Sequence, residues 1–244
     1  MRGTLHAGVA LALVACGGSS GNGDGSDHPL TGSWMGVEDR LTGGYTGTLA
    51  LEIDGDGDVT EVRVNGEDLN LTATEVDEVE GIRVYRTSDG AEFFLRRVGS
   101  SMAYVDRQDD IAVLSRGIDE VPDAGVTDTV GTFEGVSFVT DSFYNLIGST
   151  DGIGRIFDDN GSLLFDFEAP GTGCRSVGEL NLDSAQARRY TGFFVNVSGG
   201  NCPSEGDIRH YLAPSGDEVL TVACSSFSSF NVPGTCEFLL GTRQ

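Results

Sequence analysis

The sequence predicts an all-β protein made of two tandem small antiparallel β modules, each an up-and-down barrel or sandwich, with little helix. From residue 30 onward, apolar residues often alternate with polar ones at a period of two, which is typical of strands with one face on a core and one in water. Glycine next to Asp, Asn or Ser separates these stretches, which favours short hairpins. The opening and closing motifs of the body occur twice, so two modules are expected.

The first sixteen residues predict export. Arg2 precedes an apolar stretch over residues 7–14 that is too short to span a bilayer as a helix. Leu13-Val14-Ala15-Cys16 then resembles the lipobox of bacterial lipoproteins. The resemblance implies cleavage before Cys16, lipidation of that cysteine and attachment to the cell envelope. Gly17, in the position where aspartate favours inner-membrane retention, implies the outer membrane in a Gram-negative host. An ordinary secretory signal is the alternative.

The next segment is rich in glycine, serine and aspartate, so it predicts a flexible tether. The expected organisation is therefore a signal peptide (1–15), a lipidated cysteine with its tether (16–29), a first β module (30–117), a linker (118–129) and a second β module (130–244).

Alternating residues predict which face of each strand is buried. The inward sets are Leu49/Leu51/Ile53, Leu69/Leu71/Ala73, Leu163/Phe165/Phe167 and Ile208/His210/Leu212. The turn signals are Asp54-Gly55-Asp56-Gly57, Asn65-Gly66, Asp89-Gly90, Asp159-Asn160-Gly161 and Ser215-Gly216-Asp217. The best candidate for a helix is 183–189, at most two turns long.

The two modules open and close alike. Gly32-Ser33-Trp34 begins the first and Gly131-Thr132-Phe133 the second, and each ends on an apolar strand with an arginine, Arg116 or Arg243. The pair Trp34 and Arg116 resembles the lipocalin and wider calycin pattern. That resemblance implies a small β-barrel closed at one end by a guanidinium stacked on an indole, and a carrier of a small apolar ligand. The second module departs from the pattern, since Phe133 replaces the tryptophan.

The cysteines agree with an oxidising compartment. Cys174, Cys202, Cys224 and Cys236 form an even set beside Cys16, and four cysteines allow three pairings. Cys174–Cys202 and Cys224–Cys236 are favoured because sequence neighbours that flank short strand pairs meet most readily. A zinc site is the alternative, although no C-x-x-C pair supports it.

The charge balance narrows the function classes. The chain has 38 acidic residues against 15 basic ones, all arginine, for a formal charge of −23. Such a surface repels nucleic acid and anionic lipid, so membrane contact is expected only through the anchor. The absence of lysine excludes P-loop, Schiff-base and serine–lysine chemistry. The acidity indicates either attraction to basic partners or a general compositional bias.

Few residues offer chemistry. His210 is the only histidine expected in the folded body; we expect a buried neutral imidazole, with a general base as the alternative. Asp54, Asp56 and Asp58 begin like a calcium loop, but Val59 and Asn65 stand where an EF-hand needs glycine and glutamate. A hairpin turn is therefore favoured over weak calcium binding. No cofactor and no catalytic residue is predicted.

The segment between Cys224 and Cys236 is a candidate recognition loop, with Phe227, Phe230 and Val232 on a serine-rich backbone. The alternative is that both phenylalanines plug one end of the second module. The leading hypothesis is thus a non-enzymatic, membrane-anchored lipoprotein that binds a protein partner or assists envelope assembly. A carrier of a small apolar ligand is second, and a hydrolase that uses His210 is third.

Overall fold

The computed structural model describes residues 28–41, 44–107, 110–140, 146–198, 204–224 and 236–244. All regular structure in these residues is strand, so the predicted all-β class is confirmed. The strands of the first sheet are β1 (Gly32–Arg40), β2 (Tyr45–Ile53), β3 (Val59–Val64), β4 (Glu67–Asp68), β5 (Ala73–Val79), β6 (Ile82–Thr87), β7 (Glu92–Val98), β8 (Ser101–Asp106) and β9 (Asp110–Arg116). Those of the second are β10 (Gly131–Thr140), β11 (Leu146–Asp159), β12 (Ser162–Ala169), β13 (Cys174–Ser184), β14 (Arg189–Asn196), β15 (Glu205–Leu212), β16 (Glu218–Cys224) and β17 (Cys236–Arg243).

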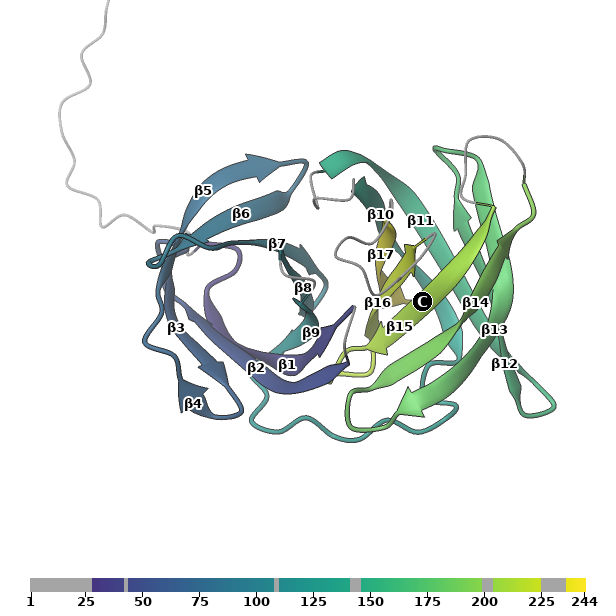
Figure 1. The fold of residues 1–244 in the computed structure, drawn as a ribbon, viewed down its shortest axis with the longest axis horizontal. Coiled ribbons are helices and arrows are strands. Elements are labelled where there is room, and N and C mark those ends of the chain that lie inside the picture. Colours follow the sequence, from purple (N-terminus) through teal and green to yellow (C-terminus); the bar gives the residue numbers. More distant parts are fainter. Residues whose placement is uncertain (1–27, 42–43, 108–109, 141–145, 199–203, 225–235) are drawn as a thin grey trace, which may run out of the picture.

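Both sheets close into antiparallel barrels that lie next to each other (Figure 1). In barrel 1, β1 pairs with both β2 and β9, β2 pairs with β3, and a single bridge between Val59 and Ala73 joins β3 to β5. The two-residue β4 lies outside this ring as an extension of β3. In barrel 2, β10 pairs with β17 and closes a ring of eight consecutive strands. The chain therefore forms two up-and-down barrels in tandem.

Local turn chemistry explains the meander. Asn160 and Gly161 both adopt positive φ between β11 and β12, at 56° and 96°. Asn65 and Gly66 do the same between β3 and β4, at 55° and 80°. Two successive residues of positive φ give the tight turn whose twist matches that of paired strands.

The helix predicted at 183–189 is wrong. β13 continues to Ser184, a four-residue turn follows, and β14 begins at Arg189. The Ser184 hydroxyl oxygen accepts the Ala187 amide at 3.1 Å, and Arg188 adopts a φ of 50°. Seven residues are too few for a stable helix, and the long neighbouring strands draw the segment into a hairpin instead.

The strand set Leu69/Leu71/Ala73 is also wrong at its start. β5 begins only at Ala73, and Leu69 is 44% exposed. The Asp68 carboxylate accepts the Asn70 amide, and Asn70 adopts a φ of 53°. This local turn interrupts the ladder, since aspartate and asparagine compete for backbone hydrogen bonds.

Each barrel has its own apolar interior. The alternating sets of β2 and β12 point inward as predicted, with Leu49, Leu51 and Ile53 buried in barrel 1 and Leu163, Phe165 and Phe167 in barrel 2. The largest side chains of barrel 1, Trp34 and Tyr85, are fully buried. Both interiors are therefore packed cores rather than channels.

A third apolar cluster joins the barrels. It gathers outward-facing residues of β8 and β9 with outward-facing residues of β16 and β17, including Val105, Val113, Leu220 and Leu240. The Phe138 and Phe238 rings stack within it at 4.9 Å between centroids. Because strands of both barrels bury their outer faces here, the two barrels share an apolar interface that is separate from their two interiors.

Two segments expected to be loose connections are packed on the barrels. The His28 amide donates to the Gly55 carbonyl at 3.1 Å, and the His28 ring contacts Arg83 and Glu75. His28 thus belongs to the end of barrel 1, and the expectation that His210 is the body's only histidine is wrong. In the connection between the barrels, Ala124 is buried and its amide donates to the Ala185 carbonyl, so this segment covers one end of barrel 2.

Candidate functional site

Each barrel carries a stacked arginine on its first aromatic residue. The Arg116 guanidinium lies 5.9 Å from the centre of the Trp34 ring, and these residues are direct cross-strand partners in β1 and β9. Arg243 lies 4.9 Å from the centre of the Phe133 ring, with the same pairing between β10 and β17. The structure therefore brings together the barrel-closing pair that the sequence suggested and repeats it in barrel 2.

The arginine side chains also pack closely on the glycines that precede the aromatic residues. A Cβ on Gly32 would lie 2.9 Å from Arg116 Nε, and one on Gly131 would lie 2.7 Å from Arg243 Nη1. Arg243 also donates to the carbonyls of Val130 and Gly216. Each arginine side chain thus lies over the first aromatic ring of its barrel and against the glycine two residues before that ring.

His210 lies inside barrel 2 at 1% exposure. Its Nδ1 pairs with the Thr221 hydroxyl at 2.8 Å, and its Nε2 pairs with the hydroxyl of Thr129, a buried residue of the connection. Burial, together with a smaller contribution from the nearby Arg243 charge, lowers the pKa of His210 to about 3. Both ring nitrogens are occupied by threonines, so the imidazole does not contact a serine or carboxylate that it could activate.

The aspartates of the β2–β3 turn bind their own backbone. The Asp54 carboxylate accepts the amides of Asp56 and Asp58, both at 3.0 Å. Asp54 also exchanges backbone hydrogen bonds with Asp58 and Gly57. The arrangement is a hairpin turn. Within the part of the chain that the structure describes, no three His, Cys, Asp or Glu residues gather in a geometry that could hold a metal ion.

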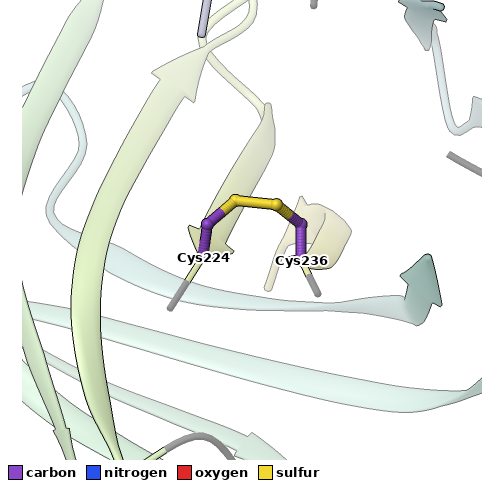
Figure 2. Close-up of a disulfide and its surroundings, with 2 residues drawn as sticks. All are labelled: Cys224 and Cys236. Atoms are coloured by element: carbon purple, nitrogen blue, oxygen red, sulfur yellow. A yellow bond between two sulfur atoms is a disulfide. The ribbon is translucent and has the colours of Figure 1, made fainter. Parts of the chain in front are cut away.

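Cys224 and Cys236 are bonded to each other, as Figure 2 shows. They are direct partners in β16 and β17 and lie buried in the cluster between the barrels. Cys174 is also disulfide-bonded. Its favoured partner Cys202 lies outside the described residues, as do the lipidation candidate Cys16 and the recognition-loop candidates Phe227, Phe230 and Val232.

Beside His210, the described interior of barrel 2 leaves little room for a ligand. The void beside His210, lined by Phe133, Phe165 and Leu239 among others, measures about 10 Å³. A void of this volume holds about one water molecule, whereas binding sites for small molecules measure about 300–1,000 Å³. Near the other end, the buried Glu237 carboxylate accepts the Ser137 hydroxyl at 2.6 Å, and burial raises the pKa of Glu237.

Sequence reasoning missed a buried ionic cluster between the barrels. Asp39 of β1 is fully buried and pairs with Arg189 and Arg209 of barrel 2, while the Tyr211 hydroxyl donates to the same carboxylate. At a second point Glu218 of barrel 2 accepts the hydroxyls of two serines of barrel 1, including Ser101 at 2.9 Å. These contacts fix the orientation of one barrel on the other.

Hydrogen bonding also sets the charge state of Glu218. Burial alone would raise its pKa, but hydrogen bonds from Ser215, Ser100 and Ser101 outweigh that effect, so the pKa lies below its ordinary value. The residue is therefore ionised at neutral pH. Its two partners in barrel 1, Ser100 and Ser101, lie more than a hundred residues away along the chain, so no local sequence pattern could reveal this contact between the barrels.

The outer surface of barrel 2 keeps an apolar stripe, which we call the β14 face. It consists of Val177, Phe193, Val195 and Val197, with the carboxylates of Glu179, Glu205 and Asp207 around them. Phe193, Val195 and Val197 are 49%, 46% and 52% exposed. A shallow groove of about 570 Å³ runs over Phe193, Glu179 and Asp207. β12 to β14 lie on the side of barrel 2 away from barrel 1 (Figure 1).

Barrel 1 has a groove of about 460 Å³ on β5, β6 and β7, the strands that correspond to β13, β14 and β15 in the repeat. Val76 and Val79 are 44% and 43% exposed beside it. Its charges, unlike those of the β14 face, are largely paired, since Glu92 bonds to both Arg86 and Arg107. Among the described residues, no helix is long and apolar enough to cross a membrane.

Comparison with known proteins assigns no family. No family model and no curated protein matches the chain. Similar solved structures include transferrin binding protein B from serogroup B Neisseria meningitidis, with a TM-score of 0.42 and 10% identity over 86% of this chain and 43% of that one. This chain therefore spans less than half the length of that protein.

Two further structures are similar. A protein of unknown function from the DUF3598 family of Nostoc punctiforme gives a TM-score of 0.37 at 9% identity, covering 88% of this chain and 96% of that one. The intact transferrin binding protein Ap-TbpB, with its N and C lobes, gives a TM-score of 0.30 at 9% identity, covering 86% of this chain and 46% of that one.

Proposed function

We propose that this protein is a non-enzymatic lipoprotein of the cell envelope, anchored through Cys16 to the outer membrane, which binds a protein partner on its outer surface. The observation that carries the proposal is the contrast between inside and outside in barrel 2. In the described part of its interior, the void beside His210 measures about 10 Å³, whereas its outer β14 face leaves three large apolar side chains half exposed.

The filled interior argues against the carrier that the calycin resemblance implied. A carrier barrel needs a cavity of several hundred cubic ångströms, and in barrel 2 the space is taken by aromatic and aliphatic side chains such as Phe133, Phe165 and Phe167. In barrel 1, Trp34, Tyr85 and Met102 are fully buried in the same way. His210 also gives no support to a hydrolase, since its ring is enclosed between two threonines.

Two features support a binding surface. Contiguous exposed apolar residues rimmed by polar groups mark interaction sites on soluble bodies. The two barrels are fixed to each other by the shared apolar cluster and by the Asp39 contacts. A rigid body loses less entropy on association than one with a mobile hinge, because its surface is already ordered.

The anchor is tested by mass spectrometry of the native protein. The expected amino terminus is Cys16 carrying a diacylglyceryl thioether, and Cys16→Ser should release the protein from membranes. An unmodified amino terminus at another residue would overturn the envelope assignment.

Partner binding is tested with the lipid-free mature protein, immobilised and exposed to solubilised proteins of the native envelope. A partner retained in stoichiometric amount, absent from a column of an unrelated acidic protein, is the expected result. The variant Phe227→Ser/Phe230→Ser reports whether the disulfide-flanked loop takes part. Release of a stoichiometric apolar small molecule on solvent extraction of native material, with no protein retained, would overturn the proposal in favour of a carrier.

A further inference from the structure

The β14 face places an exposed aromatic ring between two carboxylates. Phe193 of β14 is the direct cross-strand partner of Glu179 on β13 and of Asp207 on β15. Directly paired residues of neighbouring strands lie on the same face of a sheet. Outside the barrel, therefore, the row across the strands reads carboxylate, phenyl ring, carboxylate.

The next row along the strands is built differently. Val195 pairs with Val177 on one side and with Glu205 on the other. Residues two apart on a strand are about 7 Å apart, so an apolar row with a single carboxylate lies next to the ring. Val197 extends this apolar row. The Val197 amide still donates to the Arg175 carbonyl, although β14 has ended at Asn196.

Within the described part of the chain, none of these three carboxylates has a counter-charge of its own. Among the described residues, no ion pair and no side-chain hydrogen bond involves Glu179, Glu205 or Asp207. The neighbouring Arg209 is engaged with Asp39 instead. In a chain of formal charge −23, this face attracts cations and repels phosphate or anionic headgroups.

We propose that the β14 face binds an arginine-containing segment of the protein partner, with a guanidinium over the Phe193 ring between Glu179 and Asp207, and with apolar neighbours on Val177, Val195 and Val197. A cation placed over an aromatic face is attracted by the ring, and guanidinium is the cation that pairs best with carboxylates while stacking on a ring. The inference rests on the proposed function and names the chemistry of its partner.

The probe is a synthetic peptide that alternates arginine and valine, with a second peptide that carries glutamate in place of arginine. Binding to the lipid-free mature protein is measured by calorimetry at two salt concentrations. The arginine peptide should bind, with an affinity that falls as salt rises, and the glutamate peptide should not.

Variants locate the site. Phe193→Ser should weaken binding of the arginine peptide about tenfold, because the peptide would cover the exposed half of the Phe193 side chain. Glu179→Gln/Asp207→Asn should weaken it by a similar factor and flatten the salt dependence. The matched controls are Val76→Ser/Val79→Ser, equally exposed on barrel 1, and Asp119→Asn/Glu120→Gln, exposed acids of the connection; neither should change the affinity.

Equal losses of affinity in the control variants would mean that the peptide binds exposed apolar or acidic residues anywhere on the protein. The site would then be refuted. Self-association of the wild type that Phe193→Ser abolishes, seen by size-exclusion chromatography, would assign the face to a second copy of the chain and also refute it. If the envelope partner is retained equally by wild type and Phe193→Ser, the β14 face is wrong while the binding function stands. If no envelope partner is retained, the function itself fails.

Discussion

The buried imidazole of His210 should make the protein sensitive to mild acid. In the folded state its pKa is about 3, whereas in the unfolded chain it is near the ordinary value of about 6.5. Between these values the unfolded chain binds a proton that the folded protein does not. The free energy of unfolding therefore falls as pH decreases below about 6.5 and continues to fall until about pH 3.

The size of the effect follows from the difference in proton binding. One pH unit within this window corresponds to about 1.4 kcal/mol, so the His210 contribution falls by about 2 kcal/mol between pH 7 and pH 5. In His210→Gln that contribution is absent, although the lost hydrogen bonds to Thr129 and Thr221 lower stability at every pH. The difference in the free energy of unfolding between wild type and variant should thus narrow by about 2 kcal/mol between pH 7 and pH 5.

Urea unfolding, followed by far-ultraviolet circular dichroism at pH 7, 6 and 5, measures this difference in the free energy of unfolding. Other titrating groups, including Glu237, are present in both proteins, so their effects cancel in the difference. Thr129→Val is the matched control, because it removes one hydrogen bond of the ring but keeps the imidazole; its pH dependence should parallel that of the wild type. Parallel curves for wild type and His210→Gln would refute the reasoning.

Three further perturbations test the packing of the barrels. Asp39→Asn leaves two arginines of barrel 2 without their buried counter-charge and should cost about 3–5 kcal/mol in urea unfolding; an unchanged midpoint would contradict the role of this cluster. Cys224→Ala/Cys236→Ala opens a loop of sequence separation 12 and should lower the free energy of unfolding by about 3 kcal/mol, from the chain entropy of the loop; an unchanged urea midpoint would contradict this. Gly135→Ala drives a Cβ to within 2.0 Å of a backbone carbonyl and should lower the thermal midpoint clearly, whereas Gly154→Ala meets only a leucine methyl at 3.1 Å and should change it little.

Much of the barrel interior could be predicted because its signal is local. The period-two pattern of Leu163, Phe165 and Phe167 marks one face of β12, and turn pairs such as Asn160-Gly161 mark its end. The prediction failed where the pairing of adjacent strands overrode the local preference of a short segment. The segment 183–189 has a helical composition, but the strands on either side pair with each other and turn it into a hairpin.

The apolar interface between the barrels has a signature in the sequence. β16 is buried at every residue from Glu218 to Cys224, and β17 is buried from Cys236 to Gly241. A strand that is apolar on both faces is typically covered on both. Such strands in a small barrel indicate a second body packed on the outside, which is where barrel 1 lies.

The polar contacts of the interface left no such trace. Asp39 meets Arg189 and Arg209 across 150 and 170 residues, and nothing in the flanking residues of an aspartate distinguishes it from the chain's many other acids. The same holds for the row of Glu179, Phe193 and Asp207, whose members come from three strands.

By itself, the sequence determined the main turns, the inward faces of the strands over residues 49–53, 163–167 and 208–212, and the aromatic and arginine residues at the ends of both repeats. Each of these depends on residues a few positions apart. Only the tertiary structure decided that each sheet closes on itself, that the barrels fuse through their outer faces and that one outer face stays uncovered. These outcomes depend on pairings such as Phe133 with Arg243 and on which apolar surfaces meet. A linear pattern of burial specifies that a face is apolar but not what covers it.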